Sequence, residues 1–503
     1  MLIEEKRFKY TLRQKIGLFA GPVVFVLFLL LMPTPSGMSP EAHRTAAVAV
    51  LMAIWWLTEA ISISATALLP LALFPLLGIQ GVKETAVSFG DSNIYLFFGG
   101  FLLAAAMEKC KLHLRIAYGI ITIIGKNPRL IILGFMCAAA FLSMWISNTA
   151  TTLMMLPIGL ASIIAIEALD EIDDKTAQYF GVALMLGIAY GASVGGIGTL
   201  IGTPPNIIFT GAAASLYPDL PEIGFMKWMI MAVPVTLILL PVIWLMLTRF
   251  IFKISGAQMT SARKTLLEKR AALGPMRIDE KKVLVIFLLT AAGWIFRKDI
   301  ALGSFIIPGW SDIFPHPEYI NDATVAIAAA VILFITPVDR KFSGFLLTWK
   351  EARGIPWGIL ILFGGGIALA AGFESSELST WLGQNLKALQ GLPVWLFIFL
   401  IALLVTFLTE VTSNTATASL FMPIMGGLAV SVGFHPYLLM LPAALSASCA
   451  FMLPVATPPN AIVFGSGRIE MMQMAKTGFL INIIGAVVIT LAIYFIAVPL
   501  LNL

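Results

Sequence analysis

The chain has 503 residues, of which 59% are hydrophobic and only 12% are charged. A surface of that composition cannot be kept in water, so the sequence predicts an all-α polytopic membrane protein. The net charge of +5 is small for this length, and membrane topology explains the excess of Lys and Arg without nucleic acid as a partner.

The N-terminal region is a basic arm that continues into an apolar run at 16–32. No small-residue cleavage site follows, so we expect residues 1–45 to form a cytoplasmic arm and an uncleaved first helix. Further apolar stretches lie at 46–77, 94–107, 116–124, 131–168, 180–211 and 228–252, and then at 283–296, 323–335, 357–372, 394–430, 438–464 and 478–501. By length they predict about eleven transmembrane helices. Two apolar stretches, at 131–168 and 394–430, do not fit the pattern of a full crossing and are called the odd stretches below.

One interior linker is strongly basic. Residues 253–282 carry eight Lys or Arg against three Asp or Glu. If this linker and the N-terminal arm both lie in the cytoplasm, the positive-inside rule is met twice. The sequence therefore predicts a multi-pass protein of the cell membrane with its N-terminus inside and its C-terminus outside.

The chain also contains an internal duplication. The motif SNTAT occurs at 147–151 and again at 413–417, and LFFGGFLLAAAMEK at 96–109 matches LFGGGIALAAGFES at 362–375. A second pair follows in the same order, GTPPN at 202–206 and ATPPN at 456–460. Ordered matches of this kind indicate two repeats, at 46–252 and 283–476, with 477–503 as a final transmembrane helix.

Each repeat is expected to contain five crossings and one odd stretch, so the two repeats enter the membrane with opposite orientation. Ser, Asn and Thr favour helix starts, so each SNT motif can form the tip of a re-entrant hairpin. The Pro pairs must unwind the helices that run through TPPN. Unwound backbone at that depth has to line a cavity or be buried, which is the plan of secondary transporters.

The chemistry of these breaks indicates an anion held together with a cation. Helix starts favour anions, whereas neither the tips nor the breaks contain Lys, Arg or His. The motifs are rich in carbonyl, hydroxyl and amide oxygens, which suit a hard cation such as Na⁺. The anion site would then be complete only with the cation bound. A single such motif would more often be packing between helices, but its repetition in both halves favours a binding site.

The paired SNT tips, the paired TPPN breaks and the stretch AIWWLTEAISISATALLPLALFPLLGI at 53–79 resemble the divalent anion/sodium symporter (DASS) family of dicarboxylate transporters. The resemblance covers almost the whole chain. It implies a homodimer in which a scaffold domain carries a mobile transport domain that works as an elevator. By motif match, the substrate carboxylates would be held by Ser147, Asn148, Thr149, Thr203, Pro204, Ser413, Asn414, Thr415, Thr457 and Pro458.

The same resemblance implies two sites for Na⁺ as the coupling ion. The first would be formed by Ser143, Ser147, Asn148 and Gly202. The second would be formed by Thr409, Thr412, Ser413, Asn414 and Ala456. Gly202 of the first repeat is replaced by Ala456 in the second, which removes no backbone carbonyl.

The sequence thus predicts Na⁺-coupled uptake of C4-dicarboxylates such as succinate, fumarate and malate. The alternatives on the same fold are a Na⁺-independent dicarboxylate exchanger and a carrier of citrate or sulfate. An anion channel is a rival of another class. An enzyme is not expected, because GASVG at 191–195 lies in an apolar helical run and no catalytic constellation accompanies it. Glu410, beside the second tip, is open to three interpretations: a proton relay, a buried structural acceptor, or a residue that faces water.

Overall fold

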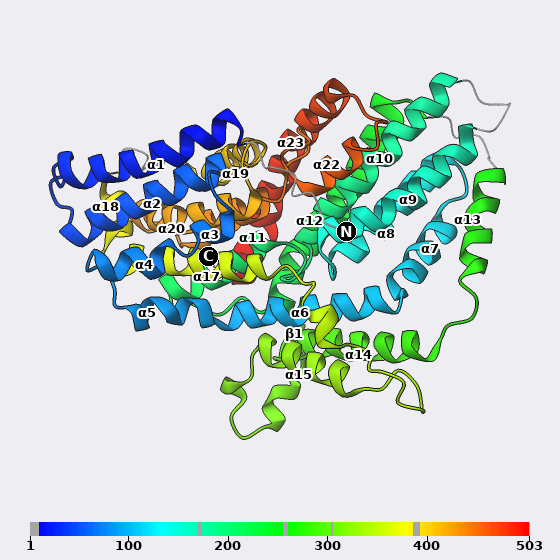
Figure 1. Ribbon diagram of the computed structural model, residues 1–503, viewed down its shortest axis with the longest axis horizontal. Helices are drawn as coiled ribbons and strands as arrows, with labels where there is room; N and C mark the ends of the chain where they lie inside the picture. The colour runs from blue at the N-terminus through cyan, green and yellow to red at the C-terminus, as the bar shows by residue number, and fades with distance from the viewer. Residues whose placement is uncertain (1–9, 168–173, 255–259, 303–304, 386–392, 502) are drawn as a thin grey trace, which may run out of the picture.

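The computed structural model describes residues 10–167, 174–254, 260–302, 305–385, 393–501 and 503. Helices dominate these residues, which confirms the predicted class (Figure 1). Seven helical segments among them are long and apolar enough to cross a membrane: 12–31, 82–109, 148–167, 175–197, 225–251, 357–375 and 471–501. One departure is a short antiparallel pair, β1 (Ile300–Leu302) and β2 (Phe305–Ile307), with Ile300 opposite Ile307.

The first helices begin at well-formed caps. Thr11 and Gln14 make a capping box at the start of α1 (Leu12–Leu31), and Ser39 caps α2 (Pro40–Thr58). Short pieces then lead to a long helix and its neighbour: α3 (Ile63–Thr66), α4 (Leu69–Leu76), α5 (Val82–Val87), the 3-10 turn η1 (Ser88–Gly90), α6 (Ser92–Lys109) and α7 (Leu112–Ile124). These elements precede the first hairpin.

The first odd stretch is a helical hairpin, as predicted. Helix α8 (Pro128–Ser143) ends four residues before α9 (Asn148–Glu167) begins, so the SNT motif lies at the tip. The helix through TPPN is broken into α10 (Asp174–Ile197) and α11 (Pro204–Leu216), where Pro occupies the first helical position. Helix α12 (Phe225–Leu245) and the π-helical turn η2 (Met246–Ile251) complete this half.

The basic linker docks on the first half before the chain continues. Arg115 of α7 donates to the carbonyl oxygen of Gly274 (3.0 Å) and to Glu280 (2.7 Å).

The linker and the chain that follows it, up to the second hairpin, form a series of helices with one strand pair. These elements are α13 (Thr260–Ala272), α14 (Ile278–Ile295), the strands, the 3-10 turns η3 (Trp310–Ile313) and η4 (Pro317–Tyr319), α15 (Asp322–Ile335), α16 (Trp349–Ala352), α17 (Trp357–Ser375) and α18 (Leu378–Asn385).

The second half repeats the hairpin and the broken helix. Its hairpin consists of α19 (Val394–Thr409) and α20 (Asn414–Ser431), and its broken helix of α21 (Tyr437–Ser446) and α22 (Pro458–Phe464). The chain then forms α23 (Met471–Ala492), the π-helical turn η6 (Ile493–Ala497) and α24 (Val498–Leu501). Both α12 and α23 therefore run directly into a π-helical turn.

The two halves interlock at the broken helices. Helix α11 of the first half packs on α20, α17 and α21 of the second, while α22 of the second half packs on α9 and α10 of the first (Figure 1). Each unwound segment thus lies where its helix passes from one half to the other. This exchange brings both hairpin tips and both helix breaks to the same region.

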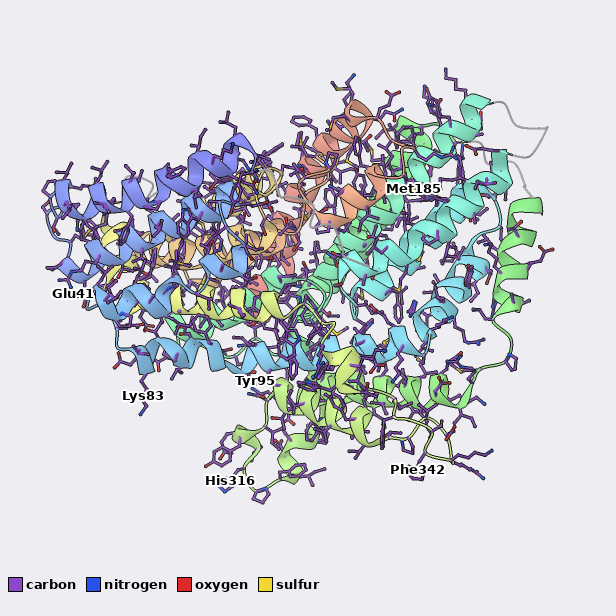
Figure 2. The ribbon with its side chains drawn as sticks, viewed as in Figure 1. Glu41, Lys83, Tyr95, Met185, His316 and Phe342 are labelled. Atoms are coloured by element: carbon purple, nitrogen blue, oxygen red, sulfur yellow. The ribbon has the colours of Figure 1, made fainter. Side chains whose placement is uncertain are left out.

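Buried and exposed side chains follow the expected division between protein interior and lipid. Trp56, Trp228 and Trp294 are fully buried, whereas Phe19 and Leu30 of α1 are largely exposed. Large apolar side chains on an outer helix face are expected where lipid, rather than water, is the solvent. Figure 2 shows the side chains of the described residues, and its labelled Lys83, His316 and Phe342 extend from the periphery. Cys110, Cys137 and Cys449 are free cysteines.

The predicted limits of the repeats stay a prediction. The spacing from Leu12, where α1 begins, to Ile278, where α14 begins, equals the spacing from Ser147 to Ser413. The shared π-helical turns likewise relate α12 to α23. These correspondences favour repeats that include the first and the last long helix, both of which lie outside the predicted limits of 46–252 and 283–476.

Candidate functional site

Both tips and both helix breaks open onto one cavity of about 990 Å³. Thirteen of the fifteen predicted site residues line it. They are Ser147, Asn148, Thr149, Gly202, Thr203, Pro204, Thr412, Ser413, Asn414, Thr415, Ala456, Thr457 and Pro458. The structure thus brings together residues that lie up to about 310 positions apart in the sequence, although the role of each one stays a prediction.

The two remaining residues, Ser143 and Thr409, lie behind the tips at equivalent positions. The Ser143 hydroxyl donates to Asn148 Oδ1, and the Thr409 hydroxyl donates to Asn414 Oδ1 (2.6 Å). Both hydroxyl residues are fully buried. Each asparagine at a tip therefore has its amide oxygen fixed by a hydroxyl from the preceding helix.

The first tip lies tightly against the end of α10, where the unwound segment begins. A Cβ atom added to Gly196 would lie 2.4 Å from Asn148 Oδ1, and one added to Gly202 would lie 2.3 Å from the Gly196 carbonyl oxygen. Only glycine fits such an approach. Hydroxyl, amide and carbonyl oxygens are thereby brought together, and this donor set fits a hard monovalent cation.

The second tip has an equivalent but less crowded arrangement. Thr409 donates not only to Asn414 but also to the carbonyl oxygen of Ala447 (3.1 Å), and the Thr412 and Thr417 hydroxyls are 2.6 Å apart. The Ser413 hydroxyl makes no side-chain capping hydrogen bond with α20, although Ser413 is the N-cap residue of that helix. Together with the wall at Ala456, these oxygens also fit a hard cation.

Two asparagines anchor the unwound segments in the same way. Asn206 Nδ2 donates to the carbonyl oxygens of Gly196 (3.1 Å) and Thr199 (2.7 Å). Asn460 Nδ2 donates to those of Ala450 (3.1 Å) and Leu453 (3.0 Å). Both asparagines are completely buried, and each satisfies carbonyl groups that the helix break leaves without helical partners. The asparagine of each TPPN motif thus holds the unwound segment in place, and the two are called the braces below.

The electrostatic character of the cavity comes from helix starts. Helices α9, α11 and α20 begin on the cavity wall at Asn148, Pro204 and Asn414, and the seven-residue α22 begins there too. No Lys, Arg or His is found among its lining residues in the described ranges. Arg468, the basic residue nearest in sequence, pairs with Glu167 instead. Partial positive charge at the helix starts would therefore be the main attraction for an anion in this cavity.

Sequence reasoning missed one wall of the cavity. It is formed by Tyr10, Gln14, Glu59, Ser62, Ser64, Phe97 and Phe101. Glu59 pairs with Arg13 at 3.5 Å, and both side chains are about half exposed. The available signal was the helix interruption at Ser62 and Ser64, which marks a bend but not the side to which it faces.

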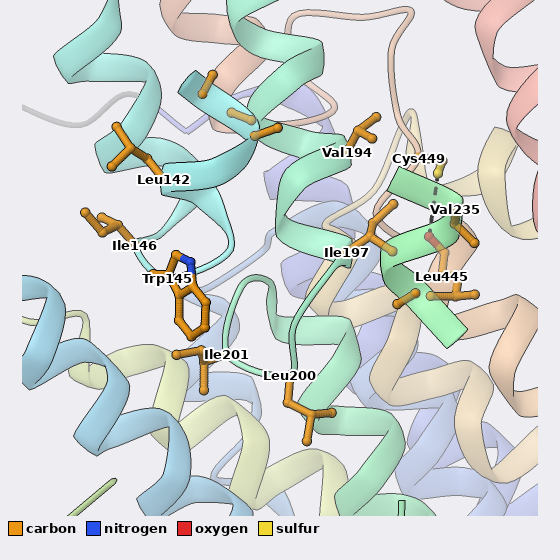
Figure 3. Close-up of a cluster of buried hydrophobic side chains, with 14 of the residues drawn as sticks. Leu142, Trp145, Ile146, Val194, Ile197, Leu200, Ile201, Val235, Leu445 and Cys449 are labelled. Atoms are coloured by element: carbon orange, nitrogen blue, oxygen red, sulfur yellow. Dashed lines mark hydrogen bonds between the residues drawn. The ribbon is translucent and has the colours of Figure 1, made fainter. Parts of the chain in front are cut away.

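The first tip is flanked by aromatic packing that the motifs did not indicate. The indole of Trp145 lies at the tip beside Ile201 of the unwound segment (Figure 3). Its ring stacks on Phe225 and Trp294 with centroid distances of 6.1 and 6.4 Å. Asp322 fixes this group, since it accepts from the Phe225 amide (2.8 Å) and from Arg297 (2.6 Å).

Comparison with known proteins places the chain among transporters. The profile of the family described as the sodium:sulfate symporter transmembrane region matches residues 14–503. A protein of Staphylococcus saprophyticus named sodium-dependent dicarboxylate transporter SdcS is 43% identical over 98% of this chain and 93% of its own. The protein of the same name from Staphylococcus aureus strain MRSA252 is also 43% identical, with the same coverage.

Two solved transporters share the fold at low sequence identity. MtrF of Neisseria gonorrhoeae, whose structure is described in terms of antimetabolite efflux pumps, aligns with a TM-score of 0.57 and 12% identity over 94% of this chain and 98% of its own. The YdaH transporter of Alcanivorax borkumensis aligns with a TM-score of 0.52 and 14% identity over 80% and 86% of the two chains. These likenesses concern the fold alone.

Proposed function

This chain belongs to the family of the sodium:sulfate symporter transmembrane region, and on that premise we propose that it is a secondary active transporter that couples Na⁺ to the uptake of C4-dicarboxylates. Succinate, fumarate and malate are the proposed substrates. The relatives at 43% identity are named sodium-dependent dicarboxylate transporters, which supports both the ion and the substrate class. The matched proteins are transporters, and the chain is not an enzyme.

A single observation carries the proposal: two equivalent SNT tips open onto one cavity. A dicarboxylate has two separated anionic ends, and the duplicated motif offers it two sets of hydroxyl, amide and backbone N–H groups. Helix starts at both tips favour negative charge at each end. A substrate with one carboxylate would leave one tip without a partner, so the arrangement favours dianions.

Na⁺ would supply the positive charge that the cavity wall lacks. In our proposal Ser143, Ser147, Asn148 and Gly202 hold one ion, and Thr409, Thr412, Ser413, Asn414 and Ala456 hold the other. Each tip asparagine orders its oxygen toward this role through the hydroxyl behind it. Because the same tips hold cation and substrate, binding of one is expected to favour binding of the other.

The packing supports a moving unit that contains both hairpins. Helix α11 packs on α20, and α22 packs on α9, so neither hairpin can shift far without the broken helix of the other half. We propose that these elements move together as the transport domain of an elevator, against a scaffold that includes α1, α2, α6 and α15. The homodimer, the inner N-terminus and the outer C-terminus belong to the same proposal.

The test is uptake of radiolabelled succinate into proteoliposomes that contain buffer only. With an inward Na⁺ gradient we expect concentrative, saturable uptake, and without Na⁺ we expect none. Uptake that ignores Na⁺ but requires internal dicarboxylate would instead establish an exchanger. Flux that neither saturates nor accumulates succinate would establish a channel, and both outcomes contradict the proposal.

A further inference from the structure

Glu410 is a buried acid at the end of α19, directly after Thr409, and it is held by four hydrogen bonds. Its carboxylate accepts from the backbone amides of Phe451 (2.6 Å), Met452 (2.9 Å) and Leu453 (3.0 Å). It also accepts from Asn482 Nδ2 of α23 (2.7 Å). All four partners are donors, and an ionised carboxylate, which only accepts, matches them.

No basic side chain accompanies this acid. Glu410 is 3% exposed, and it forms no ion pair with a Lys, Arg or His of the residues that the structure describes. Two other buried acids have basic partners: Asp322 is paired with Arg297 at 2.6 Å, and Glu280 with Arg115 at 2.7 Å. A buried charge without a counter-charge is costly, and no Lys, Arg or His in the described part of the chain offsets this cost at Glu410.

The segment that Glu410 holds leads to Ala456, which belongs to the second cation site proposed above. Glu410 fixes the amides at 451–453 on one side of the unwound chain, while Asn460 fixes the carbonyl oxygens of Ala450 and Leu453 on the other. Thr409, its neighbour in sequence, joins Asn414 to Ala447 at the beginning of the same segment. The carbonyl groups between α21 and α22 are therefore set in place before any ion arrives.

The first half has no such charge at the equivalent place. Met144 occupies the position in the first hairpin that Glu410 occupies in the second, counted from the SNT motifs. The Met144 methyl group would lie 2.8 Å from a Cβ added to Gly198, so it rests on the unwound segment just as Glu410 does. Here the link between tip and segment is the Thr199 hydroxyl, which donates to the Met144 carbonyl oxygen.

We propose that Glu410 is a positioning residue of the second cation site, and that the Na⁺ bound there is the counter-charge of its carboxylate. This inference rests on the proposed function. Its consequence is that the two cation sites are unequal: the second binds Na⁺ more tightly, because Glu410 adds a negative charge near it, whereas the equivalent residue of the first hairpin is the uncharged Met144.

The test is Glu410→Gln, which keeps the shape of the side chain and removes its charge. We expect the Na⁺ concentration for half-maximal succinate uptake in proteoliposomes to rise about tenfold, as the loss of a nearby unit charge predicts. At saturating Na⁺, the KM for succinate should remain within about twofold of the wild-type value. Glu108→Gln, which removes an exposed glutamate at the end of α6, is the matched control and should leave both values unchanged.

The outcomes separate this inference from the function on which it rests. Wild-type protein without Na⁺-dependent uptake contradicts the proposed function. Wild-type uptake with an unchanged Na⁺ dependence in the Gln variant overturns the role of Glu410, and so does an equal change in both constants together with a lower maximal rate, which indicates structural damage. If the variant does not fold, Asn482→Ala is measured instead. It removes one donor from the carboxylate and should raise the half-maximal Na⁺ concentration about twofold, so an unchanged value overturns the proposal.

Discussion

The two hairpin tips have the same motif but are held in different ways. The first tip packs against glycines on one side and against an aromatic stack on the other, in which Trp145 contacts Phe225 and Trp294. The residue at the equivalent position of the second tip is Val411, which is 50% exposed on the cavity wall. The second tip is instead tied to its unwound segment by Glu410. Duplication thus preserved the groups proposed to bind ligand, while the supports behind them diverged.

This difference distinguishes the groups proposed to act in transport, which are the same at both tips, from the groups that stabilise each tip, which are not. The pairs Ser143 with Asn148 and Thr409 with Asn414 are equivalent, as are the braces Asn206 and Asn460. Equivalent groups should have equivalent roles in transport, whereas groups that differ between the tips should affect the two halves unequally.

The largest effect is expected from the asparagines at the tips. Asn148→Ala and Asn414→Ala should each reduce succinate uptake by about a hundredfold, since each removes a polar anchor shared by cation and substrate. Uptake into proteoliposomes measures this, with size-exclusion chromatography as the check on folding. Full uptake by either folded variant would show that its tip is packing and not part of a site.

A second prediction concerns the crowding at the first tip. Gly196→Ala would place a methyl group 2.4 Å from Asn148 Oδ1, so we expect Asn148 to be displaced and succinate uptake to fall about tenfold. The equivalent residue of the second half is already alanine, and Ala450→Gly is the matched control. We expect Ala450→Gly to change uptake less than about twofold. Equal losses in both variants would contradict the difference between the tips.

Much of this arrangement could be predicted from the sequence because it is carried by local chemistry. Clustered Ser, Asn and Thr favour helix starts, and adjacent Pro residues disrupt the preceding turn, so the hairpins and the broken helices were predicted from the motifs at 147–149, 204–205, 413–415 and 458–459. The inverted-repeat plan, with its site at the repeat interface, then placed the four breaks in one site. No contact between distant residues had to be known.

The supports of the site could not be predicted in that way. Glu410 and Asn482 are 72 positions apart, and nothing in the sequence indicates that they meet. Trp145 is adjacent to the first motif, but its partners lie on α12 and α14. A long-range contact between single residues leaves no period or spacing in the sequence, so only the folded chain reveals it.

The third prediction concerns the aromatic stack at the first tip. Trp145→Ala should lower the free energy of unfolding by about 3 kcal/mol, because it empties a large buried site among Phe225, Phe287 and Trp294. Val411→Ala at the second tip removes a half-exposed side chain and should change it by less than about 0.5 kcal/mol. Thermal unfolding in detergent measures both. Similar values for the two variants would mean that the tips are equally supported.

The smallest effect is expected at the edge of that support, where Glu222 accepts from Arg297 (3.2 Å) and Lys298 (2.7 Å). Partial burial acts to raise the pKa of the Glu222 carboxyl, but the two cations outweigh it and bring the pKa below its ordinary value of 4.5. Glu222 therefore stabilises the fold at pH values above that ordinary value, and this contribution is lost as the pH falls through the lowered pKa.

Glu222→Gln tests this sign. Its side chain is half exposed, so we expect the loss of stability at pH 7 to be at most about 1 kcal/mol. The difference from wild type in thermal unfolding should shrink as the pH is lowered below 4.5. Glu377→Gln, at an exposed glutamate that forms no ion pair among those of the described residues, is the control. If the difference in thermal unfolding between the variant and wild type grows on acidification, the charged Glu222 is destabilising. The ion pair with Arg297 and Lys298 would then not support the first tip.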